Sequence, residues 1–302
     1  MTLTRSNLHG GGFTLVELIV VIVLLGILAL GGSIFVARPI EIYQEQIRRQ
    51  QLVDAAEMAL RQIAIDVRRS LPNSLRFVDN GPNDWAIEVV ETVDGARYRD
   101  EAGAPFIVAP GAEYILDFTT ADDRFNILGV FSNNPGANLR VAIFSTNSAD
   151  VYADAVSVDA SNPFGLISQA GITLNLINGA PEGDEHQIIL DKAHRFSQQS
   201  PGQRLFLVGG PVSYTCDTTN GLVRFAGYPF RTNHGDVDSY SDLLGQTGQS
   251  HGVVASDVSR CAMDYDPGSP TRSGLLTIEL GLTNSSGDNV RLLHQLHVDN
   301  VP

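Results

Sequence analysis

A long uncharged segment near the N-terminus constrains this chain more than any other feature. Residues 18–36 form a run of 19 uncharged, mostly apolar residues, long enough to cross the hydrocarbon core of a bilayer as a helix. The leader before it, 1–12, is short, and Arg5 is its only formally charged side chain. Glu17 stands at the front edge of the run, where a charge is costly unless it is used. The sequence therefore predicts a membrane-crossing helix over 13–36 with an acidic residue near its start.

An ordinary secretory signal is the first alternative for this segment. Such a signal is cut after its apolar region next to small residues, and Gly31, Gly32 and Ser33 would allow a cut there. Two features favour a retained span instead. The run is longer than the apolar region of most signals, and Glu17 lies at its edge.

The helical pattern continues beyond the apolar run. Apolar residues recur there at the three- and four-residue spacing of one helix face; they are Ile40, Tyr43, Ile47, Ala56, Leu60, Ile63, Val67 and Leu71. Pro72 ends the pattern, because a proline disfavours helix in the residue before it. We therefore expect one helix over 13–71, softened near Gly31, Gly32 and Pro39, whose amphipathic part at 37–71 packs on the domain that follows.

The rest of the chain, 72–302, is predicted to be β-rich, because short runs of β-forming residues alternate with Gly, Pro, Asn and Asp. The expected strands are 85–93, 113–118, 140–145, 171–177, 186–190, 203–208, 222–225 and 261–265, followed by a hairpin that pairs 276–282 with 290–298 through a turn at 284–288. Two stretches rich in Ser, Gly and Asp, 147–162 and 232–252, are expected to be loops. The predicted fold class is α+β, a long N-terminal helix packed on a β-rich domain.

The charge balance and the cysteines restrict the partners and the compartment. The chain has 20 Lys+Arg against 34 Asp+Glu, a formal net charge of −14, so phosphate backbones are repelled and nucleic acid is not expected as a partner. Cys216 and Cys261 lack the spacing of a metal site. In a chain with an export signal they predict one disulfide formed in an oxidising compartment, the alternative being two buried thiols.

Motifs that would carry catalysis are missing from the sequence. It contains no GxSxG, HExxH, P-loop or GxGxxG pattern, so neither an enzyme nor a cofactor is expected. His294 and His297 form an HxxH, but in a predicted strand they point to opposite faces, and a metal site is not expected there. Asp236, Asp238 and Asp242 have a spacing that would suit calcium, and a solvated loop is the preferred interpretation.

The segment Gly12-Phe13-Thr14-Leu15-Val16-Glu17-Leu18, followed by the apolar run, resembles the prepilin processing site of type IV pilins and type II secretion pseudopilins. The resemblance implies that a prepilin peptidase cuts between Gly12 and Phe13 and methylates the new amine of Phe13. It also implies that Glu17 contacts the Phe13 amine of a neighbour in a fibre. A carboxylate that only reaches the headgroups remains the alternative for Glu17.

The same resemblance implies a place and a set of partners. The chain is expected to cross the bacterial inner membrane once, with its C-terminal domain in the periplasm, and to move into a pilus fibre or its tip. The positive-charge count does not favour this orientation, since one Arg precedes the span and Arg38, Arg48 and Arg49 follow it. The implied partners are the prepilin peptidase, other major and minor pilins, and the inner-membrane assembly platform.

The C-terminal third narrows the resemblance. The stretches RLFLVGGPVSYTC at 204–216, CAMDYDPGSPTRSGLLTIELGLT at 261–283 and LLHQLHVDNVP at 292–302 resemble MSHA-type minor pilins, and more broadly PilW-type minor pilins and J-type pseudopilins. The expected function is therefore a minor pilin that starts assembly or forms the fibre tip. Two alternatives remain: a J-type secretion pseudopilin, and a pilus-borne adhesin or ligand-binding module that would use the unmatched middle, 102–183.

Overall fold

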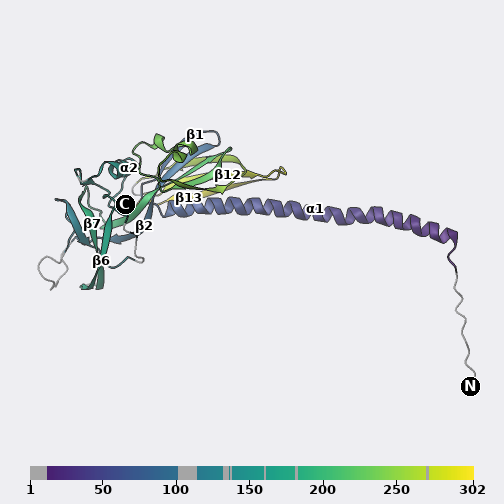
Figure 1. Ribbon diagram of the computed structural model, residues 1–302, viewed down its shortest axis with the longest axis horizontal. Coiled ribbons are helices and arrows are strands. Elements are labelled where there is room, and N and C mark those ends of the chain that lie inside the picture. Colours follow the sequence, from purple (N-terminus) through teal and green to yellow (C-terminus); the bar gives the residue numbers. More distant parts are fainter. Residues whose placement is uncertain are drawn as a thin grey trace, which may run out of the picture. The chain divides into compact units, whose positions relative to one another are not determined.

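The computed structural model describes 12–100, 114–131, 136, 138–159, 161–180, 183–269 and 272–302, without the side chains of 30–39, 179, 180 and 183. The chain divides into two compact units, 1–51 and 52–302. Its elements are α1 (Leu15–Arg68), β1 (Arg76–Gly81), β2 (Asp84–Arg97), β3 (Asp122–Asn126), β4 (Arg140–Ala142), α2 (Ser148–Ser157), β5 (Phe164–Gly165), β6 (Ile172–Ala180), β7 (Gly183–Phe196), β8 (Arg204–Asp217), β9 (Gly221–Ala226), η1 (His234–Asp236), α3 (Tyr240–Leu244), β10 (Ser250–Ala255), β11 (Val258–Asp266), β12 (Gly274–Thr283) and β13 (Asn289–Val298) (Figure 1). The α+β class, with an N-terminal helix and a β-rich C-terminal domain, agrees with the prediction.

The helix α1 ends at Arg68, three residues before the predicted end at Leu71. The reason is that the chain already pairs with β2 there: the Leu71 N–H donates to the Val90 carbonyl (2.8 Å), and the Thr92 N–H donates to the Arg69 carbonyl (2.9 Å). These bonds to a strand replace the helical ones, so tertiary pairing ends the helix before Pro72 does.

The membrane span predicted for 13–36 is not confirmed. Over the described residues, no helix is both long enough and apolar enough to cross a membrane. The side chains of the second part of that segment, from residue 30 onward, lie outside the described residues.

The domain contains three sheets. The first has the order β1-β2-β8-β9-β10, and β4 also pairs with β8. The strands β4 and β9 divide β8 between them, because β4 pairs with its residues 206–208 and β9 with its residues 212–217. The second sheet is β11-β12-β13, which contains the predicted hairpin. The third has the order β3-β7-β5, with β6 also paired to β7.

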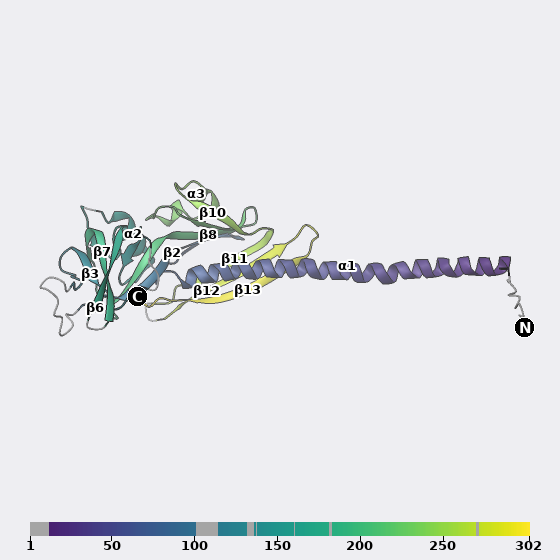
Figure 2. The same cartoon turned by 60° about the horizontal axis from the view of Figure 1, so that its bottom comes forward.

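The first core lies between the C-terminal part of α1 and the first two sheets. Its helix residues are all less than a tenth exposed, and they are Leu52, Ala56, Ala59, Leu60, Ile63, Ala64 and Val67. They pack with side chains of β2, β8, β11, β12 and β13, the last three of which run beside α1 in Figure 2. The helical spacing seen in the sequence from Ala56 to Val67 therefore marks the buried face, as predicted.

The second core lies in the part of the domain that holds β3, β6 and β7, with β4 and the first half of β8. Its largest fully buried side chains include Tyr98, Phe125 and Phe196. A smaller cluster around α2 also contains Leu71, Val90 and Val208. Because β2 and β8 have 14 residues each, one strand pair supplies side chains to both cores.

Several predicted segments need correction. The expected strand at 113–118 is not a strand over its described residues, 114–118, and the one at 140–145 shrinks to β4. The loop predicted at 147–162 contains α2, which Asn147 caps by accepting from the Asp150 N–H at 2.8 Å. The loop predicted at 232–252 contains η1 and α3 and the start of β10. In both loops short helices form because side chains cap them and buried residues hold them to the sheets.

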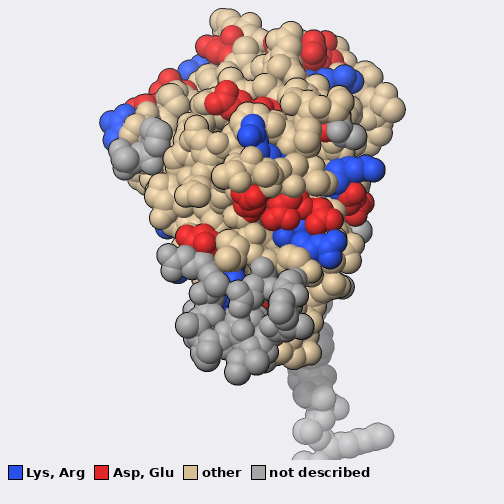
Figure 3. All heavy atoms as spheres, turned by 90° about the vertical axis from the view of Figure 1, so that its left-hand side faces the viewer, with Lys and Arg blue, Asp and Glu red and all other residues tan. Residues whose placement is uncertain are grey.

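Charges on the domain are mixed in sign. Figure 3 shows the face where β6 and β7 lie in Figure 1, with acidic and basic side chains in small neighbouring groups among uncharged ones. The described part of this face therefore carries no broad field of one sign that would attract a polyanion over its whole area.

Candidate assembly segment and inter-sheet cleft

The N-terminal segment begins α1 with a side-chain cap. The Thr14 hydroxyl accepts from the Glu17 N–H at 3.3 Å, and the Thr14 carbonyl accepts from the Leu18 N–H at 3.2 Å. Thr-x-x-Glu is the spacing of a capping box, and an acidic residue in the first turn favours the helix dipole. Glu17 thus has a role within its own chain, which sequence reasoning missed although its signal is present.

Gly12 and Phe13 are not constrained by the chain's own packing. A Cβ placed on Gly12 would meet no atom within 4 Å, and the Phe13 ring is 81% exposed. Nothing in the fold requires glycine at position 12, so a requirement for it must come from outside the chain.

The first turns of α1 expose apolar side chains on all sides. The large hydrophobic residues between Phe13 and Leu28 are each at least 43% exposed. The surface of a soluble protein rarely shows such a continuous apolar stretch. Lipid or other apolar helices would cover it. Glu17 is the one charged residue among them.

The cysteine pair joins two sheets. Cys216 of β8 and Cys261 of β11 form a disulfide, with their Cα atoms 6.2 Å apart. Both side chains are buried in the first core. Beside the bond, the Asn83 side-chain oxygen accepts from the Cys261 N–H at 3.1 Å. The edge strand β11 is therefore tied to the first sheet by a covalent link and by a hydrogen bond from the β1–β2 turn.

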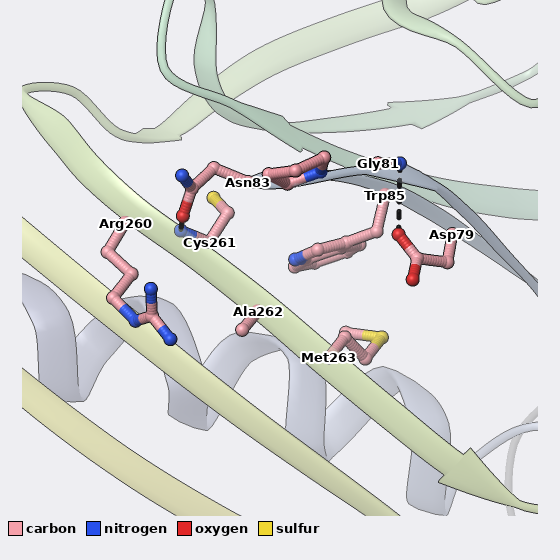
Figure 4. Close-up of a pocket in the computed structure, with 9 residues that line it drawn as sticks. Asp79, Gly81, Asn83, Trp85, Arg260, Cys261, Ala262 and Met263 are labelled. Atoms are coloured by element: carbon pink, nitrogen blue, oxygen red, sulfur yellow. Dashed lines mark hydrogen bonds between the residues drawn. The ribbon is translucent and has the colours of Figure 1, made fainter.

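A cleft of about 380 Å³ opens beside this link, between the β1–β2 turn and β11. Figure 4 shows the Trp85 indole reaching from β2 toward β11, with Met263 at one end and Arg260 on the other side of the strand. Trp85 is 2% exposed, and its indole N–H has no hydrogen-bond partner among the described residues. The ring is thus part of the core, and its face is not open for stacking on a ligand.

A buried carboxylate connects the strands of the first sheet near this cleft. Glu88 is fully buried, forms an ion pair with Arg76, and accepts from the Tyr228 hydroxyl at 2.7 Å. Burial raises the pKa of Glu88, while the positive charge of Arg76 opposes the rise. These partners satisfy the carboxylate, so it holds β1, β2 and the segment after β9 together rather than offering a free acid.

Two spacings were considered for metal binding, the HxxH at 294–297 and the aspartates at 236–242. His294 lies opposite Ile278 in the β12–β13 ladder, and His297 lies opposite Leu275. Asp242 lies in the first turn of α3, where its N–H donates to the Ser239 hydroxyl at 3.2 Å. Over the residues that the structure describes, no group of three or more His, Cys, Asp or Glu side chains is placed to hold a metal ion.

Comparison with known proteins identifies one segment. Residues 10–33 match the family model described as the prokaryotic N-terminal methylation motif. No curated protein and no solved structure matches the chain. The motif supports a type IV pilin or pseudopilin, which is a structural subunit rather than an enzyme. It implies processing by a prepilin peptidase, an inner-membrane anchor before assembly, and assembly with other pilins.

Proposed function

We propose that this chain is a minor type IV pilin of an MSHA-like pilus, which starts assembly or forms the tip of the fibre. The observation that carries the proposal is the methylation motif at 10–33, placed at the start of a helix with an exposed apolar first part. The three stretches that resemble the MSHA pilus biogenesis protein MshO contribute β8, β11, β12 and β13, and all four strands supply the first core. The resembling stretches therefore belong to strands that pack together in one core.

Processing is the first step that the proposal requires. The prepilin peptidase cuts after Gly12 and methylates the amine of Phe13. A glycine at the cut lets the enzyme approach the backbone closely, and the chain itself has no need of it. Mass spectrometry of the protein extracted from membranes should find a chain that starts at methylated Phe13. A mature chain that starts near Ile34 would show an ordinary secretory signal and overturn the proposal.

Glu17 pairs with the Phe13 amine of a neighbouring subunit in this proposal. A carboxylate in an apolar span costs about 2.5–3.5 kcal/mol at mid-membrane, and less near its edge. Two opposite charges about 4 Å apart attract by roughly 4 kcal/mol at an effective dielectric near 20, which offsets that cost. The pair would fix the axial register between subunits, and it forms only after cleavage frees the nitrogen.

Three variants separate this contact from the helix cap. Glu17→Gln keeps the capping-box pattern but removes the charge, so cleavage should persist while piliation and co-purified partner pilins fall. Glu17→Asp keeps the charge with a shorter reach and should show a milder defect. Thr14→Ala removes the cap, at about 1 kcal/mol, and keeps the carboxylate. If Thr14→Ala impairs assembly as much as Glu17→Gln does, the carboxylate acts through the helix start and the register contact is wrong.

The minor role rests on size and on the second core. Unit 2 spans 52–302 and carries two cores, which is bulky for a subunit repeated along a shaft. Such a subunit fits more easily at an end, where it has fewer neighbours. Deletion should lower the number of pili, and the protein should be scarce in purified fibres. Shaft-like stoichiometry would contradict the minor role, and loss of secretion without loss of pili would indicate the J-type pseudopilin.

One observation favours an added role as an adhesin. The middle region that resembles nothing, 102–183, contributes to the second core, which uses no residue of α1. A module with its own core can bind a ligand without altering the assembly part of the chain. An internal deletion that removes adhesion but keeps pilus number would support this role.

A further inference from the structure

A cleft with a surplus of positive charge lies where α1 ends. It has a volume of about 570 Å³ and is lined by Arg68 and Arg69, by the first residues of β8 with Arg204, and by the C-terminal tail. The tail's end, marked C, lies near the end of α1 in both Figure 1 and Figure 2. Three guanidinium groups from two distant parts of the sequence therefore share one hollow.

These three arginines make no ion pair with any described residue, and all are exposed. Among the described residues, arginines that do form ion pairs include Arg76, Arg99, Arg124, Arg224, Arg260, Arg272 and Arg291. In a chain with a net charge of −14, these three exposed cations stay available to an anion from outside the chain. The two acids at the cleft each accept from a neighbouring backbone N–H: Asp94 from Gly95 (2.8 Å), within β2, and Asp299 from Val301 (3.1 Å), in the C-terminal tail.

A second hollow of about 420 Å³ lies between α1 and the edge strand β13. Arg68 lines both, and Arg61 lies on the same helix face two turns earlier. Leu293 of β13 lines the second hollow and is 66% exposed. We call the two hollows together the arginine track; it is lined by Arg61, Arg68, Arg69 and Arg204, with Leu293 as an exposed apolar residue in the second hollow.

The floor of the track is built from fixed backbone. The β2–β8 pairing shifts register at Thr92, and the Thr92 N–H is bound to the Arg69 carbonyl. The Thr92 hydroxyl is buried without a partner in the described chain. The arginines thus project from a helix end and a strand start that hydrogen bonds hold in place, which limits the ordering cost of binding.

We propose that the arginine track binds an acidic peptide segment of a neighbouring pilin subunit, an inference that rests on the proposed function as a fibre subunit. Guanidinium groups bind carboxylates through two parallel hydrogen bonds, and Leu293 provides an apolar contact next to them. A nucleic-acid duplex is the competing anionic partner, and a DNA duplex is therefore included as a competing probe.

The test uses the full chain in detergent micelles at about 50 mM salt, where exposed charges are weakly screened. The probe is a fluorescein-labelled peptide of roughly ten alternating Glu and Asp residues, followed by anisotropy. Arg204→Glu is compared with Lys192→Glu, an exposed position on β7 with the same change in charge. We expect saturable binding that Arg204→Glu weakens roughly tenfold or more and Lys192→Glu less than about twofold. In cells, Arg204→Glu should also lower the amount of co-purified partner pilin.

Equal effects of the two variants, no saturable binding, or tighter binding of a DNA duplex than of the peptide would each overturn the proposal. Arg69→Gln is a milder second variant, should Arg204→Glu fail to fold, and it is expected to weaken binding roughly threefold. Deletion of the gene tests the proposed function separately. An unchanged number of pili would contradict the proposed function. The peptide titration tests only whether the arginine track binds an acidic peptide.

Discussion

The two cores of the domain are held together by different chemistry. The first core has a helix face, a hairpin and a disulfide, and its largest contributors are apolar. The second core encloses a buried ion pair, in which Arg99 and Glu185 are 4% and 0% exposed. Asn126 donates to Glu185 at 3.3 Å, and Gln187 donates to Asn126 at 3.2 Å.

The difference concerns what stabilises each core. A disulfide lowers the conformational entropy of the unfolded chain. The native arrangement of the first core is then determined by its apolar packing. A buried ion pair offers little net stability, because desolvation offsets the attraction, but it becomes costly when one partner is lost. The first core should therefore tolerate polar changes better, and the second should fail sharply when its charge pair is broken.

The largest expected effect comes from Glu185→Ala. The variant leaves Arg99 buried without its carboxylate, which costs about 3–5 kcal/mol. Hydrogen exchange should speed up in β6 and β7 and stay slow in β12 and β13. Asp123→Ala is the control, because its pair with Arg124 is exposed and is expected to contribute less than about 1 kcal/mol. A similar loss in both variants would mean that the second core does not depend on its buried pair.

Replacing both cysteines by serine should destabilise the first core selectively. The disulfide closes a sequence separation of 45 residues, for which chain entropy predicts about 4 kcal/mol, and measured values are commonly 2–4 kcal/mol. Trp85 is the single tryptophan and lies opposite Cys216 in the β2–β8 ladder, so its fluorescence reports on this core directly. Thiol labelling of denatured, unreduced native protein should find no free cysteine, and two labelled thiols would contradict the bond.

Removing one methylene group in each core compares their packing. Ile63 and Ile188 are both completely buried, one in each core, so Ile63→Val and Ile188→Val should each cost about 1 kcal/mol. Ile65→Val, on the same helix but 41% exposed, is the matched control and should change little. Denaturant unfolding measures all three. A loss at Ile188 several times that at Ile63 would show that the polar network makes its core less able to relax.

The smallest expected effect is a pH dependence. Burial, together with the charge of Arg76, lowers the pKa of His234 to about 4, against about 6.5 in the unfolded chain. Between these values the unfolded state binds the additional proton, so stability falls as pH is lowered from 6.5 toward 4. We expect about 1 kcal/mol for this partly exposed group. His234→Gln should flatten that slope in urea titrations, and an unchanged slope would assign it to other groups.

The sequence predicted features that follow from local spacing. The buried helix face from Ala56 to Val67, the β12–β13 hairpin and the cysteine pair all follow from periodicity or composition. The helix α2 was missed, although Asn147 supplies a cap and Val151, Tyr152 and Ala155 mark a buried face. Its surroundings, rich in Ser and Asp, concealed that signal.

Other features have no local signal. Arg99 and Glu185 are 86 residues apart, and neither position is distinguished within its own segment. The arginine track likewise combines the end of α1 with residues near 204 and 299, which only the fold brings together. Glu17 was predicted to lie at the start of the helix, and it does. The cap that Thr14 provides there was not predicted, although the Thr-x-x-Glu spacing indicates it.

The long β2–β8 pair has a mechanical consequence. Its first part, at residues 85–90 of β2, pairs inside the first core, and its later part, at 92–97, pairs beside the second. Next to the junction, β2 is bonded to the backbone of Arg69 and Leu71 just after α1. A tensile load applied to the second core would therefore be shared along the whole ladder in shear and delivered to the helix end. A subunit exposed to pulling would bear such a load without first unravelling from a loop.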